Sequence, residues 1–206
     1  MSPPTIGGSD LGGAPGLPTL VVGPSLGTSV HPLWAATVER LTDMYHVIGW
    51  DLPGHGSSPP PLRAFTIDDL AAGVVTLVGH AVGARRFCYA GVSVAGAVGL
   101  QLLLGHRERI VAAALICTAA RIGDPDDWRS RAQVVRSAGT GEMVASSVRR
   151  WFAPAFVERD PASARALLQT VVTRRNGPGV AEDVWLAPPA GRHGRGPPEN
   201  LLCPRW

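Results

Sequence analysis

The sequence predicts an α/β fold built on a mostly parallel β-sheet. Short apolar runs that suit strands alternate with longer helix-like runs between residues 18 and 123. Such alternation is typical of parallel sheets, whose helical connections cover both faces. Small and polar residues follow each strand-like run, at the edge of the sheet where such folds bind ligands. Residues 124–172 contain only helix-like runs, which indicates a helical lid after the fourth strand.

The individual elements follow from local patterns. Strands are expected at residues 20–22, 46–50, 86–91 and 112–117. Helices are expected at about 31–42, 66–82, 95–104, 127–138, 141–152 and 161–172. The second helix has the clearest start, because Thr66 suits the N-cap and Asp69 stands at the capping-box position.

The two ends of the chain differ from this pattern. Residues 1–17 are rich in Gly, Pro and Ser, and we expect a flexible leader. Residues 173–206 hold six Pro and five Gly in thirty-four positions, a composition typical of disorder. We hypothesise that the C-terminal part, from about residue 173 onward, is truncated or frameshifted.

Composition limits the classes of function. A chain of 206 residues with a net charge of +3 suits one globular domain and does not indicate a nucleic-acid surface. No apolar run reaches the length of a membrane span, and the N-terminus does not resemble a signal peptide. Cys88, Cys117 and Cys203 are too few and irregular for a disulfide framework, and the first two are expected to be buried. We expect a cytoplasmic protein without a metal site, a membrane or a nucleic-acid partner.

The most specific motif surrounds Ser93. A strand-like run ends at Gly91, Ser93 follows, and a helix-like run begins at Ala95. A serine between small residues at a strand-to-helix turn is typical of a nucleophile elbow, here with the pattern G-x-S-x-A. The helix beginning there offers free N–H groups to an oxyanion. Ala95 replaces the usual glycine, and the sequence leaves open whether this is tolerated or strains the turn.

Several segments together resemble the α/β-hydrolases, and more closely the 3-oxoadipate enol-lactonases of aromatic degradation. The segments that carry the resemblance are Gly23-Pro-Ser-Leu-Gly-Thr28, Asp51-Leu-Pro-Gly-His-Gly-Ser-Ser58, Phe65-Thr-Ile-Asp-Asp-Leu70 and Gly91-Val-Ser-Val-Ala-Gly96. The more specific part is Ile116-Cys-Thr-Ala-Ala-Arg-Ile-Gly123, followed by Trp128, Arg131 and Trp151-Phe152. The resemblance covers roughly residues 18–172.

The resemblance implies a hydrolase that opens an enol-lactone with a Ser–His–Asp triad and no cofactor. Its nucleophile corresponds to Ser93, its oxyanion donors to the backbone amides of Leu26 and Val94, and its pocket wall to Trp128. The partner would be a small-molecule lactone or ester, and the oligomeric state is left open.

The triad is where the sequence departs from the family. In the superfamily the acid and the histidine follow the nucleophile, after two further strands. The tail offers only Asp183 and His193 in that order, within a Gly/Pro-rich segment that lacks strand patterns. The sequence therefore predicts a sheet lacking its last strands and an impaired enzyme.

Other polar residues have two readings each. His55 is expected to be structural and His106 to be a helix-end residue. Arg121 and Arg131 would either lie in solvent on the lid or meet a substrate carboxylate. Three readings of function stay open: an enol-lactonase-like enzyme, a non-catalytic remnant, or a hydrolase of another ester or C–C bond.

Overall fold

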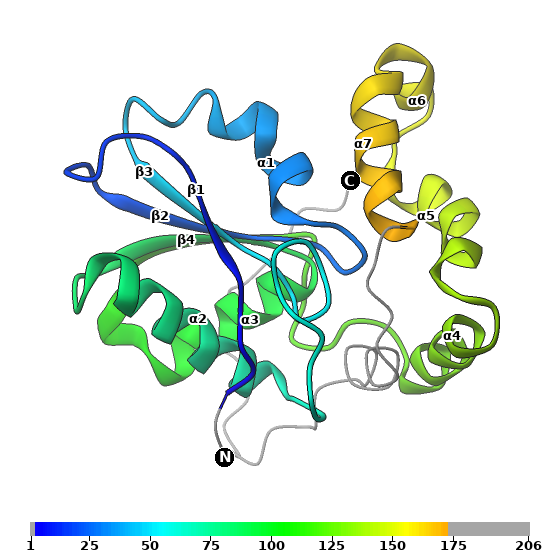
Figure 1. Cartoon of the computed structure of the whole chain (residues 1–206), viewed down its shortest axis with the longest axis horizontal. Coiled ribbons are helices and arrows are strands. Elements are labelled where there is room, and N and C mark those ends of the chain that lie inside the picture. Colours follow the sequence, from blue (N-terminus) through cyan, green and yellow to red (C-terminus); the bar gives the residue numbers. More distant parts are fainter. Residues whose placement is uncertain (1–2, 173–206) are drawn as a thin grey trace.

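Five strands form one sheet in the order β1-β3-β2-β4-β5 (Figure 1). The structure is a computed structural model and describes residues 3–172. The strands are β1 (Gly8–Gly12), β2 (Thr19–Gly23), β3 (His46–Trp50), β4 (Phe87–Val92) and β5 (Ile110–Ile116). The last four run parallel, whereas β1 pairs antiparallel with β3. The predicted α/β fold with a mostly parallel sheet is confirmed.

Helices cover both faces of the sheet and extend beyond one end of it. They are α1 (Val30–Val38), α2 (Ile67–Val82), α3 (Val94–Gly105), α4 (Pro125–Ala138), α5 (Met143–Trp151), α6 (Phe156–Arg159) and α7 (Pro161–Val172), with 3-10 turns η1 (Arg107–Arg109) and η2 (Thr140–Glu142). The helices α2 and α3 lie on one face of the sheet and α1 on the other (Figure 1). One apolar cluster joins the sheet to α2 and α3, and a second joins it to α1. The strands β2 and β3 lie between these clusters, and every residue in them is buried.

The start of α2 follows the predicted chemistry. The Thr66 hydroxyl accepts a hydrogen bond from the Asp69 N–H at 3.1 Å, and the Asp69 carboxylate accepts one from the Thr66 N–H at 2.9 Å. This reciprocal pair satisfies two backbone donors that a helix start leaves open. The predicted capping box is confirmed.

Within residues 1–17, where a flexible leader is expected, the structure contains one strand. Gly8–Gly12 forms the edge strand β1, and the Gly7 carbonyl accepts a hydrogen bond from the Asp51 N–H at 3.0 Å. The Asp10 carboxylate oxygen Oδ2 also lies 3.1 Å from Nε2 of His46, and this hydrogen bond lowers the pKa of the Asp10 carboxyl. The glycines of this segment permit close backbone packing against the rest of the sheet, so their presence does not by itself indicate flexibility.

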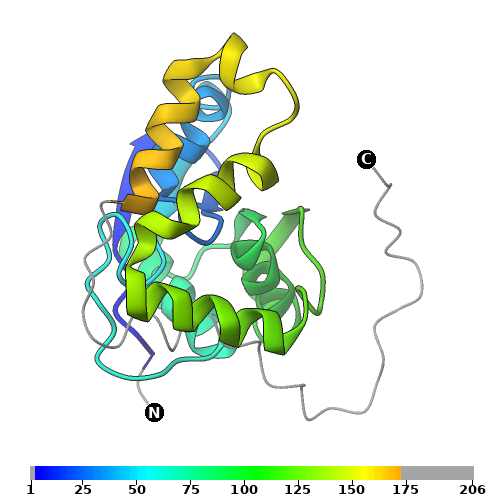
Figure 2. The same ribbon diagram turned by 90° about the vertical axis from the view of Figure 1, so that its right-hand side faces the viewer.

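The helices α4–α7 gather on the side of the molecule where the parallel strands end (Figure 2). No strand interrupts residues 124–172, and α5 and α7 pack together. A small apolar cluster of Ala132, Val135, Trp128 and Met143 ties α4 to Leu26 in the loop after β2. This arrangement places helices over the carboxyl ends of β2 and β4.

The tail from 173 to 206, with Asp183, His193 and Cys203, lies outside the described residues. Within residues 3–172, no helix combines the length and apolar character that a membrane crossing requires.

Candidate active site

Ser93 lies at the sharp turn between β4 and α3. It is the N-cap residue of α3 and has φ 56° and ψ −114°, a backbone conformation that residues other than glycine rarely adopt. Its N–H donates a hydrogen bond to the Ile116 carbonyl at the end of β5, at 2.8 Å. Such strained backbone persists only when neighbouring structure holds it, and it is frequent at functional sites.

Small residues on either side of Ser93 let the chain make this turn. A Cβ atom on Gly91 would lie 2.3 Å from the Ala95 carbonyl oxygen, so glycine is required there. Ala95 is fully buried, and its methyl group occupies space next to Gly23, where an added Cβ would come within 2.6 Å of it. The missing side chain of Gly23 therefore makes room for alanine at position 95. This packing favours the interpretation that the turn tolerates alanine in place of glycine, and not that alanine strains the turn.

The loop after β2 borders the same site, and two of its backbone donors are already used. The Gly27 N–H donates to Nε2 of His55 at 3.3 Å, and the Thr28 N–H donates to the Ser25 carbonyl at 3.1 Å. For the Leu26 N–H, no partner is found among the described residues. The same holds for the Ser25 N–H, and since both residues line the cavity described below, the Ser25 and Leu26 amides are the candidate donors of this loop for a ligand.

His55 supports this loop from the protein interior. The side chain is buried, its Nδ1 lies 3.0 Å from the Pro53 carbonyl, and its Nε2 accepts from Gly27. These two partners require the neutral imidazole with the proton on Nδ1. The geometry supports the structural reading of His55.

Asp51 fixes the neighbouring segments. Its buried carboxylate accepts hydrogen bonds from the Val30 N–H at 2.7 Å and the Ser57 N–H at 2.9 Å. The first bond satisfies a free donor at the start of α1. Asp51 is therefore engaged as a structural anchor.

The lid holds the same loop from the opposite side. The Thr170 hydroxyl of α7 donates to the Gly27 carbonyl at 3.0 Å, and the Trp151 ring of α5 packs where a Gly27 side chain would lie. Gly27 has φ +90°, a conformation that favours glycine. The loop is consequently clamped between His55 and the lid.

A cavity of about 330 Å³ lies between the sheet end and the lid. Ser93 and Leu26 line it, together with Cys117 from the end of β5 and Trp128 and Arg131 from α4. Val94 does not line this cavity, but it is the first residue of α3, where backbone N–H groups lack helical partners. The structure thus brings Ser93, Leu26 and Trp128 together around one space, with Val94 next to it.

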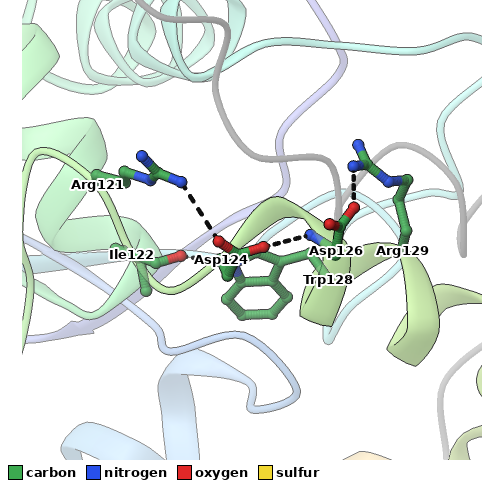
Figure 3. Close-up of polar contacts among 6 residues, drawn as sticks. All are labelled: Arg121, Ile122, Asp124, Asp126, Trp128 and Arg129. Atoms are coloured by element: carbon green, nitrogen blue, oxygen red, sulfur yellow. Dashed lines mark hydrogen bonds and ion pairs between the residues drawn. The ribbon is translucent and has the colours of Figure 1, made fainter.

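Trp128 is held in the cavity wall by the segment before α4 (Figure 3). Its Nε1–H donates to the Ile122 carbonyl. The guanidinium of Arg131 lies 5.2 Å from the centre of the indole ring. Gly123, with φ +70°, has no side chain to push against the indole nitrogen.

Arg121 lies outside this contact. Its guanidinium pairs with the Asp124 carboxylate at 3.6 Å, and both side chains are largely exposed. This ion pair supports the interpretation that Arg121 lies in solvent on the lid (Figure 3).

Cys117 was expected to be buried but is exposed to the cavity side of the sheet, and Cys88 is only half-buried. For Cys117 the prediction failed because β5 is the edge strand of the described sheet, so most of its residues are exposed, and because the strand ends one residue earlier than the apolar run suggests. Cys117 has φ 49°, so the chain turns out of the sheet at this point. Sequence reasoning had not assigned Cys117 to the site.

His106 lies at the far end of α3 from Ser93, as the residue after its last turn. A helix of 12 residues spans about 18 Å at 1.5 Å per residue. His106 is therefore a helix-end residue remote from the cavity. Across residues 3–172, no histidine, aspartate or glutamate lines the cavity.

The turn, the loop and the sheet order define the class of this protein. Residues 14–174 match the family described as the alpha/beta hydrolase fold, and the chain belongs to that family.

Within the family, the chain is similar to enol-lactonases. It is 35% identical over 145 residues to 3-oxoadipate enol-lactonase 2 of Acinetobacter baylyi, covering 70% of this chain and 53% of that protein. It is 29% identical over 161 residues to 3-oxoadipate enol-lactonase 1 of the same organism. The crystal structure of the enol-lactonase from Burkholderia xenovorans superimposes with a TM-score of 0.76 at 32% identity, covering 82% of this chain and 65% of that one. The chain thus spans just over half to two thirds of the length of these relatives.

Proposed function

We propose that this chain is a carboxylic ester hydrolase of the 3-oxoadipate enol-lactonase type, with Ser93 as its nucleophile. The observation that carries the proposal is that Ser93, on a strained turn, lines the same cavity as Leu26, whose amide has no hydrogen-bond partner among residues 3–172. The similarity to enol-lactonases supports the lactone as substrate. By the same similarity, the reaction would belong to the β-ketoadipate route of aromatic degradation.

The proposed reaction proceeds through an acyl-enzyme. The Ser93 hydroxyl oxygen attacks the lactone carbonyl carbon, and the ring C–O bond breaks. The serine proton passes through water to the departing enolate oxygen, and the resulting enol tautomerises to a ketone. Water then hydrolyses the acyl–serine ester and releases the carboxylate product. The Leu26 and Val94 N–H groups would stabilise the negative oxygen that develops in both steps. Trp128 would close the wall of the pocket, and the reaction needs no cofactor.

We further propose that turnover by this chain is impaired. Serine hydrolases use a histidine base held by an acid, and in this fold both follow the nucleophile in the sequence. After Ser93, the described part of the chain contributes one strand, β5, and one histidine, His106, which lies at the far end of α3. Loss of the base alone lowers kcat about 10⁶-fold in a serine protease. The residual rate is about 10³–10⁴ times that of the uncatalysed reaction in water.

The test is a rate comparison between two substrates and four proteins, the fourth being His193→Ala. The purified chain is assayed with 3-oxoadipate enol-lactone and with a simple aryl ester, beside Ser93→Ala and the exposed control Ser137→Ala. We expect lactone hydrolysis above the uncatalysed rate but far below a typical kcat of about 10 s⁻¹. Ser93→Ala should abolish this rate, and Ser137→Ala should retain it.

Each other outcome favours a competing reading. A rate that Ser93→Ala does not change would support the non-catalytic remnant. A preference for the aryl ester would support a hydrolase of another ester. A kcat near 10 s⁻¹ that is lost in both Ser93→Ala and His193→Ala would show that the tail supplies a base, and the impairment would be refuted.

A further inference from the structure

A buried tyrosine hydroxyl ties together the two elements that meet at Ser93. Tyr89 lies on β4, four residues before Ser93, and is only 1% exposed. Its hydroxyl donates a hydrogen bond to the Ala95 carbonyl at 2.8 Å, and Ala95 lies in the first turn of α3. This hydrogen bond therefore joins the strand before Ser93 to the helix after it. Tyr89 itself does not line the cavity.

The Ala95 carbonyl is a contact point of the whole turn. It accepts from Tyr89, and its oxygen lies so near Gly91 that an added Cβ there would come within 2.3 Å of it. A shift of this carbonyl would move the first turn of α3, which begins with Val94. The strained backbone of Ser93, with φ 56°, persists only while its surroundings hold it. The hydrogen bond from Tyr89 thus limits how far the turn can relax.

The Tyr89 ring is fixed by its own packing. It belongs to the apolar cluster that joins the sheet to α2 and α3. A Cβ on Gly99 of α3 would lie 2.8 Å from the ring, so the missing side chain there admits the tyrosine. Burial raises the pKa of the Tyr89 hydroxyl above its usual range. The hydroxyl therefore keeps its proton and remains a donor at neutral and mildly alkaline pH.

Resting on the proposed function, we propose that Tyr89 is a positioning residue, whose hydroxyl holds the first turn of α3 and thereby the turn at Ser93. Phenylalanine would fill the same space but leave the Ala95 carbonyl without this donor. Because Tyr89 lies outside the cavity, its loss changes the reaction of Ser93 and not the binding of a ligand. Small displacements matter at a nucleophile, since a misplacement of about 1 Å can lower a rate about 10²-fold.

The test measures both the reactivity of Ser93 and the order of the turn. Labelling by a fluorophosphonate at several concentrations separates the maximal labelling rate, kinact, from the half-saturating concentration, KI. Hydrogen exchange of the Ala97 amide, measured by NMR, reports on the turn directly, because this N–H donates to the Ser93 carbonyl at 3.0 Å. Its exchange rate is expressed relative to that of the α2 amides, so that a general loss of stability cancels.

The variant is Tyr89→Phe, and two controls accompany it in the full chain. Tyr45→Phe removes the hydroxyl of the other tyrosine, which packs against the cluster that joins the sheet to α1. Val78→Ala removes buried methyl groups from the same cluster as Tyr89 and leaves the hydrogen bond to Ala95 in place. Circular dichroism establishes that each variant is folded.

We expect Tyr89→Phe to lower kinact about tenfold while KI stays within about twofold, and to do so equally at neutral and mildly alkaline pH. The Ala97 amide should exchange about tenfold faster relative to the α2 amides, and both controls should behave as the parent does. An unchanged exchange ratio, an unchanged kinact, or an equal loss in either control would overturn the proposal. A parent chain that takes no label on Ser93 would refute the proposed function, and the exchange ratio alone would then decide whether Tyr89 holds the turn.

Discussion

At the scale of single residues, the site depends on two glycines, because the absence of a side chain at each leaves room for a neighbouring group. Gly91 allows the chain to pass the Ala95 carbonyl, and Gly23 leaves room for the Ala95 methyl group. Ser93 could be predicted from its sequence neighbours, because a serine between small residues marks this turn. The compensation between Gly23 and Ala95 could not be predicted, since these residues are far apart in sequence and meet only in the folded sheet.

Gly91→Ala tests this packing. The added methyl group would lie 2.3 Å from a backbone oxygen that cannot move without disturbing the start of α3. We expect the free energy of unfolding to fall by about 2–4 kcal/mol. The matched control is Gly79→Ala in α2, where an added Cβ meets nothing within 4 Å and should stabilise the helix by about 0.5–1 kcal/mol. Urea denaturation measures both, and equal stabilities would refute the packing argument.

His55→Leu tests the support of the loop after β2. The change removes the acceptor of the buried Gly27 N–H, and an unsatisfied buried donor costs about 1–3 kcal/mol. We expect a loss of stability in that range, measured by thermal or urea unfolding. The exposed control His80→Leu should differ from the parent by less than about 0.5 kcal/mol. If His55→Leu is as stable as the control, His55 does not hold the loop.

At the scale of secondary-structure elements, the sequence predicts buried strands and capped helices well but misses β1. The strands β2, β3 and β4 are short apolar runs, and α2 carries its capping box in the sequence. By contrast, β1 reads Gly-Ser-Asp-Leu-Gly, which has neither the apolar alternation nor the β-branched residues that predict a strand. Its pairing depends on contacts with β3 and on glycines that accept close backbone approach, and neither is visible locally.

Gly13→Ala tests whether this N-terminal segment is ordered. Gly13 has φ +87°, and a Cβ there would lie 1.9 Å from the Tyr45 carbonyl oxygen. We expect a loss of about 2–4 kcal/mol in unfolding free energy. Gly16→Ala is the matched control three residues later, because a Cβ there meets nothing within 4 Å, and its effect should stay within about 0.5 kcal/mol. Two equally stable variants would support the flexible leader instead.

At the scale of the whole molecule, the part that the structure describes ends at an apolar edge. The strand β5 pairs with β4 on one side, and no other strand within residues 3–172 pairs with it. Its residues Val111 and Ile116 are 56% and 39% exposed. An uncharged edge strand of this kind is a template for pairing between chains.

We therefore expect this chain to associate in a concentration-dependent manner through β5. Val111→Lys places a charge on the edge strand and should shift the protein toward the monomer, as measured by analytical ultracentrifugation. Leu62→Lys is the control, since Leu62 is fully exposed but lies in a loop. A parent chain that stays monomeric at all concentrations, or an equal response of both variants, would contradict an edge-strand interface.

The claim on which the whole account rests is that Ser93 is the nucleophile of the cavity. Its most direct measurement is covalent labelling by a fluorophosphonate, with the modified residue located by mass spectrometry. We predict a slow reaction that reaches one label per chain, placed on Ser93 and absent from Ser93→Ala. A label on Ser25 or Ser146, which line the same cavity, or no label on any serine after prolonged incubation, would contradict the account.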